Sequence, residues 1–152
     1  MKIDKNIDSL EETKALAENL AKALEGKQAL IVCKGDLGAG KTTFTKYLGK
    51  ALGVKKIINS PTFTILKSYQ MADGRNLHHM DVYRMEGMNQ DLGFEECFEE
   101  NAICIVEWPQ FIKSQLPKKR IELSIFQKEG EKRLFSFETE DETFKKLLED
   151  LA

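Results

Sequence analysis

Eight consecutive residues, Gly35-Asp36-Leu37-Gly38-Ala39-Gly40-Lys41-Thr42, match the pattern G-x-x-x-x-G-K-[ST] without a mismatch. The motif follows a short apolar run, Ala29 to Cys33, of the kind expected for a strand buried on both faces. It precedes a segment with helical spacing of apolar residues, Lys41 to Leu52, which Gly53 is placed to end. A strand, a glycine-rich loop and a helix in this order restrict the chain to α/β folds.

The residue types in this motif suit phosphate binding. Glycines lack a Cβ, so the loop can turn successive backbone N–H groups toward an anion, and the start of the following helix also favours negative charge. We expect Lys41 to reach the β- and γ-phosphates of a nucleoside triphosphate and the Thr42 hydroxyl to ligate Mg²⁺. Thr43 is a residue of the helix rather than a second ligand. The predicted nucleotide-binding residues of this segment are Gly35, Asp36, Leu37, Gly38, Ala39, Gly40, Lys41, Thr42 and Thr43.

Length and composition indicate a single domain spanning residues 1–152. A hydrophobic content of 41% is enough for a sizeable core, and the net charge of −2 provides no basic field for unspecific nucleic-acid binding. If RNA is involved, we expect another subunit to hold it. No apolar stretch approaches a membrane span and no secretory segment opens the chain, which favours a cytoplasmic protein. The three cysteines lack C-x-x-C spacing and are expected to be reduced.

Hydrophobic periodicity predicts the other elements. A capping box at Ser9 to Glu12 begins a first helix, which Gly26 ends. Two strand candidates joined by an Asp73-Gly74 turn predict an antiparallel hairpin inserted in the α/β pattern. The predicted strands are 57–58, 62–69, 77–83, 102–106, 121–125 and 134–137, and the predicted helical segments are 91–100, 110–115 and 144–151.

Two acidic residues are candidates to act beside the glycine-rich loop. Glu107 ends the apolar run 102–106, so we expect its carboxylate at the carboxyl edge of a sheet, where open α/β sheets bind ligands. Asp81 can arrive there from the hairpin. We assign Mg²⁺ organisation jointly to Thr42, Asp81 and Glu107, and the catalytic roles to Lys41 and the two acids. The sequence does not decide which acid polarises water, and a surface or helix-capping role is the alternative for each.

Three further features are open to interpretation. The segment 60–64, with Thr62, is either a switch that senses the γ-phosphate or an ordinary proline turn. Trp108 directly follows Glu107 and is the only tryptophan, so we expect its fluorescence to change on nucleotide binding. His78 and His79 are adjacent on a predicted strand and point to opposite faces, which suits structural roles better than metal ligation.

Four segments in one chain resemble the bacterial TsaE (YjeE) family, the ATPase subunit of tRNA threonylcarbamoyladenosine biosynthesis. They are GDLGAGKTTF at 35–44, SPTFT at 60–64, HMDVYR at 79–84 and VEWP at 106–109. Their order and spacing match over almost the whole chain. The resemblance implies a P-loop NTPase fold, in which helices flank a mixed, mostly parallel sheet, with ATP/ADP and Mg²⁺ as cofactors and weak ATP hydrolysis by the isolated protein.

The resemblance also implies partners and further site residues. The partners are the TsaB and TsaD subunits, of which TsaD carries the transfer of the threonylcarbamoyl group to adenosine 37 of tRNAs reading ANN codons. Thr13 is implied near the nucleotide, and Arg133 is a weaker match to a family arginine near ATP. Thr62 and Trp108 join the predicted nucleotide-binding residues because of their positions in the sequence.

Other functional classes fit the sequence less well. A small-molecule kinase would bring several arginines onto a mobile lid, whereas the four arginines here are dispersed. A GTPase would show an N-K-x-D segment, and the chain has none. An ATP-dependent binding module without turnover is harder to separate from a slow ATPase, because the two look alike in sequence.

Overall fold

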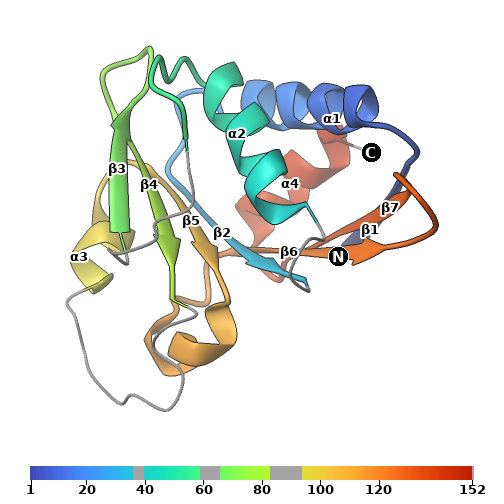
Figure 1. Cartoon of the computed structure of the whole chain (residues 1–152). Coiled ribbons are helices and arrows are strands. Elements are labelled where there is room, and N and C mark those ends of the chain that lie inside the picture. The colour runs from blue at the N-terminus through green and yellow to red at the C-terminus, as the bar shows by residue number, and fades with distance from the viewer. Residues whose placement is uncertain (36–39, 59–65, 83–93, 152) are drawn as a thin grey trace.

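The computed structural model describes residues 1–35, 40–58, 66–82 and 94–151. These residues form a mixed α/β structure in which helices cover a single twisted sheet (Figure 1). The strands are β1 (Lys2–Ile7), β2 (Ala29–Lys34), β3 (Leu66–Gln70), β4 (Asn76–Asp81), β5 (Ile103–Glu107), β6 (Ile121–Gln127) and β7 (Arg133–Glu138). The helices are α1 (Leu10–Ala23), α2 (Lys41–Ala51), α3 (Phe94–Glu99), the 3-10 helix η2 (Pro109–Gln115) and α4 (Glu142–Leu151).

The sheet has a parallel centre and antiparallel edges. Its strand order among the described residues is β1-β7-β6-β2-β5-β4-β3. Strands β6, β2, β5 and β4 pair in parallel, whereas β1, β7 and β6 pair antiparallel at one edge and β4 and β3 at the other. The expectation of a mostly parallel sheet therefore holds only for the middle. The predicted hairpin is confirmed, but it continues the main sheet because β4 bonds to β5.

Each face of the central strands packs against a different set of helices. On one face, Ile31 and Ile105 pack in a cluster with Leu20 of α1 and Leu48 of α2. On the other face, Val106 packs in a cluster with residues from α3 and η2. Because both faces are covered, β2 and β5 consist of apolar residues nearly throughout, as the sequence predicted. The helices on the first face include α2, which begins at the candidate site.

The first helix begins at the predicted capping box. The Ser9 hydroxyl accepts a hydrogen bond from the Glu12 backbone N–H at 3.2 Å, and the Glu12 carboxylate accepts one from the Asp8 N–H at 2.6 Å. The box thus closes one residue earlier than the standard pattern. It fixes the start of α1, whose buried face packs on α2.

The remaining elements were predicted with two errors. Strand β1 was missed because only two of its residues, Ile3 and Ile7, carry an apolar pattern, and its pairing with β7 forms it. The strand expected at Ile57 and Ile58 is wrong: Ile58 is a buried loop residue packed against Gly49, and Ile57 is 80% exposed. The other predicted strands and helices are confirmed where the structure describes them, and the parts at 62–65, 83 and 91–93 lie outside the described residues.

Gly53 generates a stability prediction. Its φ of +89° is unfavourable for other residues, and a Cβ there would overlap the Ala72 side chain and lie 2.8 Å from the Ala72 backbone nitrogen. Gly26 has a φ of +72° and open space around it. We expect Gly26→Ala to cost about 1–2 kcal/mol for the backbone conformation alone. Gly53→Ala should cost on the order of 1–3 kcal/mol more, because it also forces a clash. Urea denaturation measures both, and equal losses would contradict the close approach.

Candidate functional site

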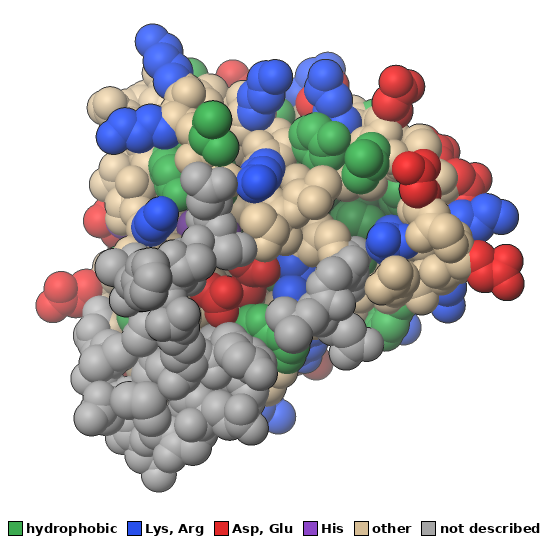
Figure 2. Space-filling model, viewed as in Figure 1, with side chains coloured by type: hydrophobic (Ala, Val, Ile, Leu, Met, Phe, Trp, Pro, Cys, Tyr) green, Lys and Arg blue, Asp and Glu red, His purple; other side chains and the backbone are tan. Residues whose placement is uncertain are grey.

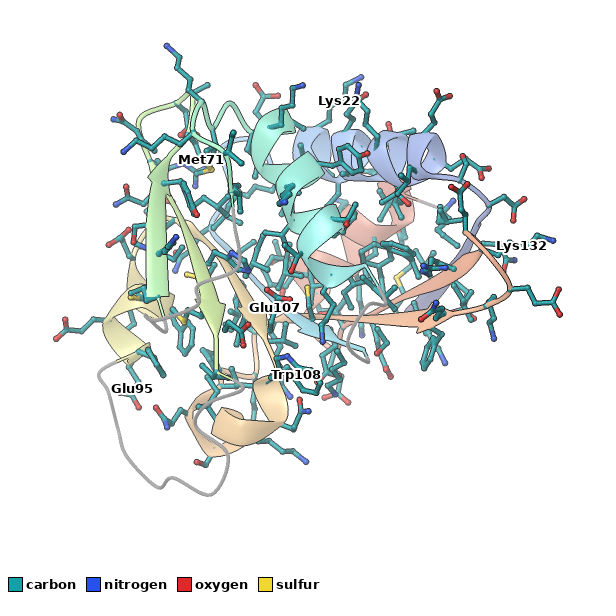
Figure 3. All side chains as sticks on the ribbon, in the orientation of Figure 1. Lys22, Met71, Glu95, Glu107, Trp108 and Lys132 are labelled. Atoms are coloured by element: carbon teal, nitrogen blue, oxygen red, sulfur yellow. The ribbon has the colours of Figure 1, made fainter. Side chains whose placement is uncertain are left out.

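The carboxyl ends of three parallel strands meet beside the start of α2. Glu107 of β5 is in register with Cys33 of β2 on one side and with Asp81 of β4 on the other. Side chains two residues apart on a strand share a face. Because Ile105 belongs to the cluster on the α2 face, Glu107 points toward α2 as well. Figure 3 shows Glu107 and Trp108 near the first turn of this helix.

The helix that follows the glycine motif begins at Gly40. This residue has a left-handed backbone, with φ of +109°, and its carbonyl accepts the first helical hydrogen bond from Phe44 N–H at 2.9 Å. A glycine has no side chain with which to cap a helix, and the N-terminal end of a helix carries partial positive charge that favours an anion. Of the predicted loop residues, those at 36–39 lie outside the described residues.

Lys41 is buried although its side chain is basic. It is 6% exposed, its ammonium donates to the Gly35 carbonyl oxygen, and the same nitrogen lies 3.8 Å from the centre of the Trp108 ring. Trp108 has φ of +60°, the only positive φ of a non-glycine residue in the described part of the chain. The indole of Trp108 lies against the Lys41 ammonium, and a cation over an indole face is attracted to it. The structure thus brings together two residues that the sequence assigned to the site.

Glu107 is buried in contact with a histidine. Its side chain is 3% exposed, and its Oε2 lies 2.6 Å from Nε2 of His79, which is fully buried. Sequence reasoning gave His79 a structural role and did not connect it with Glu107. The spacing of the two residues indicates the contact, because His79 stands two residues before Asp81 and therefore shares its face of β4. His78 differs as expected, since it bonds Ser68 and Glu100 instead.

Asp81 completes the edge of the site. It is half-buried at the end of β4, opposite Glu107, and the next residue, Val82, donates its N–H to the Glu107 carbonyl at 3.2 Å. This bond extends the pairing beyond the last strand residue and fixes the two acids relative to each other. Near the carboxyl ends of β4 and β5, Figure 2 shows acidic side chains reaching the surface.

The pKa of the buried Cys33 thiol responds to both charged groups of this region, Glu107 and Lys41. Burial raises its pKa most, the nearby Glu107 carboxylate raises it further, and the Lys41 ammonium lowers it. Cys33 is therefore a neutral packing residue in the field of both charged groups. Neither Cys33 nor the other two cysteines forms a disulfide.

The other predicted site residues are spread over separate elements. Thr42 and Thr43 lie half-buried in the first turn of α2. Thr13 is buried in α1, where its hydroxyl donates to the Ser9 carbonyl at 3.3 Å. Arg133, at the start of β7, donates to the carbonyl oxygens of Gly130 and Lys132. Thr62 lies outside the described residues.

The donor set fits a hard cation shared with a phosphate ligand. The Thr42 hydroxyl and the carboxylates of Asp81 and Glu107 are all oxygen ligands, which Mg²⁺ prefers. Among the residues that the structure describes, no three His, Cys, Asp or Glu side chains form a group able to hold a metal ion.

A family model and curated relatives of this chain carry the same family name. A family model described as "Threonylcarbamoyl adenosine biosynthesis protein TsaE" matches residues 7–135. The chain is 44% identical over 143 residues to the tRNA threonylcarbamoyladenosine biosynthesis protein TsaE of Bacillus subtilis, covering 93% of this chain and 89% of that protein. It is 38% identical over 114 residues to the TsaE protein of Streptomyces coelicolor, covering 72% and 76%.

A solved structure agrees with the sequence matches. The crystal structure of Bacillus subtilis YdiB superimposes with a TM-score of 0.84 at 36% identity, over 99% of this chain and 94% of that one. Within the described residues, no helix has both the length and the apolar character that crossing a membrane requires.

The contact between Lys41 and Trp108 yields a spectroscopic prediction. Because the chain has a single tryptophan, all of its tryptophan emission comes from Trp108, whose ring Lys41 contacts. Lys41→Met removes the charge above the indole and should shift the emission of the ligand-free protein. Lys46→Met, at an exposed position of the same helix, should leave the spectrum unchanged. Identical spectra for all three proteins would contradict the stacked arrangement.

The cysteines give a second prediction. The thiolate is the nucleophile in alkylation, so a raised pKa slows the reaction. Burial raises the pKa of Cys33 and brings that of Cys104 to about 12, and it also raises the pKa of the half-buried Cys97. At pH 8 we expect iodoacetamide to modify Cys97 slowly and to spare the other two until the protein is denatured, as mass spectrometry can establish. Rapid modification of Cys33 in the folded protein would be inconsistent with its burial.

Proposed function

The chain belongs to the TsaE family of threonylcarbamoyl adenosine biosynthesis proteins, and from this premise we propose that it is a magnesium-dependent ATPase that supports tRNA threonylcarbamoylation. The contact that supports nucleotide binding best is the one between Lys41 and Trp108. The single basic residue of the glycine motif, Lys41, thereby lies beside the strand end that carries Glu107. A P-loop ATPase needs this neighbourhood of a phosphate-binding lysine and an acid.

The residues divide into three roles in this proposal. Lys41 leaves its resting contacts with Gly35 and Trp108 and binds the β- and γ-phosphates. The Thr42 hydroxyl, with Asp81 and Glu107, holds Mg²⁺ or its bound water, and one of the two acids orients the attacking water. Bound Mg²⁺ supplies neutralisation of the charge on the phosphate oxygens. Burial of Glu107 and Lys41 strengthens their electrostatic effect on a ligand, since little water screens them.

We infer that the protein acts with TsaB and TsaD in the cytoplasm and does not itself transfer the threonylcarbamoyl group. The net charge of −2 supports this division of roles, because it leaves tRNA binding to the partners. The modified nucleotide would be adenosine 37 of tRNAs reading ANN codons. The segment 60–64, for which the sequence leaves a switch or a proline turn open, lies outside the described residues.

Reconstitution with purified TsaB and TsaD tests the proposal. We expect ATP-dependent phosphate release and modified tRNA from the wild-type protein, and neither from Lys41→Ala. Asp81→Asn and Glu107→Gln, tested separately, should each lower hydrolysis on the order of 100-fold or more while the protein remains folded. Glu100→Gln is the matched control, because this acid contacts His78 outside the site, and it should hydrolyse ATP at the wild-type rate.

Three outcomes would change the proposal. Full hydrolysis by Glu107→Gln would remove this residue from the mechanism. Phosphorylation of a small molecule in place of phosphate release would favour a kinase. ATP binding without turnover in the complete assembly would favour a binding module.

A further inference from the structure

We propose that His79 is a positioning residue that holds the Glu107 carboxylate in the orientation needed for ATP hydrolysis. The inference rests on the proposed function, and it adds a residue to the site that neither the family motifs nor the comparisons assign to this task. His79 lies on β4, Glu107 lies on β5, and their side chains meet at 2.6 Å between Nε2 and Oε2.

The direction of this hydrogen bond follows from the chemistry of the two groups. An ionised carboxylate only accepts, so the imidazole must donate from Nε2. A charge-assisted bond of this length is among the stronger ones in proteins. Nδ1 of His79 has no hydrogen-bond partner in the part of the chain that the structure describes. Among the described residues, Glu107 is therefore the hydrogen-bond partner that orients the His79 ring.

The contact with His79 involves one of the two carboxylate oxygens of Glu107 and leaves the other available to a ligand. His79 engages Oε2, so Oε1 is the oxygen that can face a metal-bound water or the attacking water. A carboxylate held at one oxygen has lost most of its rotational freedom. Because the Val82 N–H also binds the Glu107 carbonyl, both the backbone and the side chain of this acid are tied to β4. Pre-positioning of this kind removes an ordering cost from the reaction.

A purely structural role for the pair makes a different prediction. A buried acid needs a hydrogen-bond partner wherever it lies, and His79 supplies one. If that were its whole purpose, variants would lower stability and leave the turnover of the folded fraction intact. Positioning instead predicts a loss of kcat in folded protein, with little change in KM.

The first experiment compares variants in the complex with TsaB and TsaD. His79→Leu fills the space without a donor and should lower kcat about 10- to 100-fold while KM stays within about twofold. His79→Gln can place an amide N–H near the position of Nε2 and should restore kcat to within about threefold of wild type, whereas the shorter His79→Asn should not. His78→Gln, on the neighbouring residue, should behave as wild type.

The outcomes separate the possible failures. Wild-type kcat in folded His79→Leu, or equal kcat in the Gln and Asn variants, would overturn the positioning role and leave the proposed function standing. If His79→Leu does not fold, the comparison of Gln with Asn decides alone. Absence of turnover in wild type would overturn the proposed function, and the positioning role with it.

A second measurement needs no nucleotide. Nitrogen NMR of the histidines in the ligand-free protein should show a proton on Nε2 of His79, with a resonance that moves in Glu107→Gln, while the His78 resonances stay in place. An unprotonated Nε2, or a His79 signal indifferent to Glu107→Gln, would show that the contact is absent and would overturn the inference directly.

Discussion

The parallel pairing of β4 and β2 with β5 is the constraint on which the site depends. Parallel strands end at the same edge of a sheet, so the register that pairs Glu107 with both Cys33 and Asp81 also brings their side chains to one place. The helix α2 begins at that edge because it follows β2 through the glycine motif. A shift of one residue in β5 would turn Glu107 to the opposite face.

Polar groups in this region are buried to a degree that stability alone does not favour. Lys41, His79 and Glu107 are each less than a tenth exposed, and burying charged or polar groups costs free energy unless they are paired. Each has a described partner: Gly35 and Trp108 for the lysine, and one another for the acid and the histidine. The arrangement keeps both charged groups largely out of solvent, where their electrostatic effect on a neighbouring group is stronger than in water.

The sequence was sufficient to predict the central strands and α2, but not the elements whose structure depends on pairing with a distant strand. Strands β2 and β5 carry doubly buried apolar runs, and α2 follows a motif with fixed spacing, so both were predicted. Strand β1 has a weak apolar pattern and is stabilised by its pairing with β7. Ile57 and Ile58 are residue types that favour strands, but both lie in a loop. Local propensity does not contain this information.

The same limit applies to the site. Lys41, Glu107 and Trp108 were found from motif and position, and the structure brings Lys41 against Trp108. The contact between His79 and Glu107 depends on the parallel pairing of β4 with β5. The sequence predicted the hairpin that contains β4, but not its pairing with β5. Knowledge of that single pairing would have placed His79 beside the acid, since the side chains of a strand alternate between its faces.

Calorimetry can establish whether the glycine motif and the acids beside it bind a nucleotide. The folded protein, alone and with TsaB and TsaD, is titrated with ATP in the presence and absence of Mg²⁺, and Lys41→Ala is titrated in parallel. We expect saturable binding that Mg²⁺ strengthens and that Lys41→Ala loses. If folded wild-type protein takes up no nucleoside triphosphate in either setting, the glycine motif and the acids beside it do not form a nucleotide site.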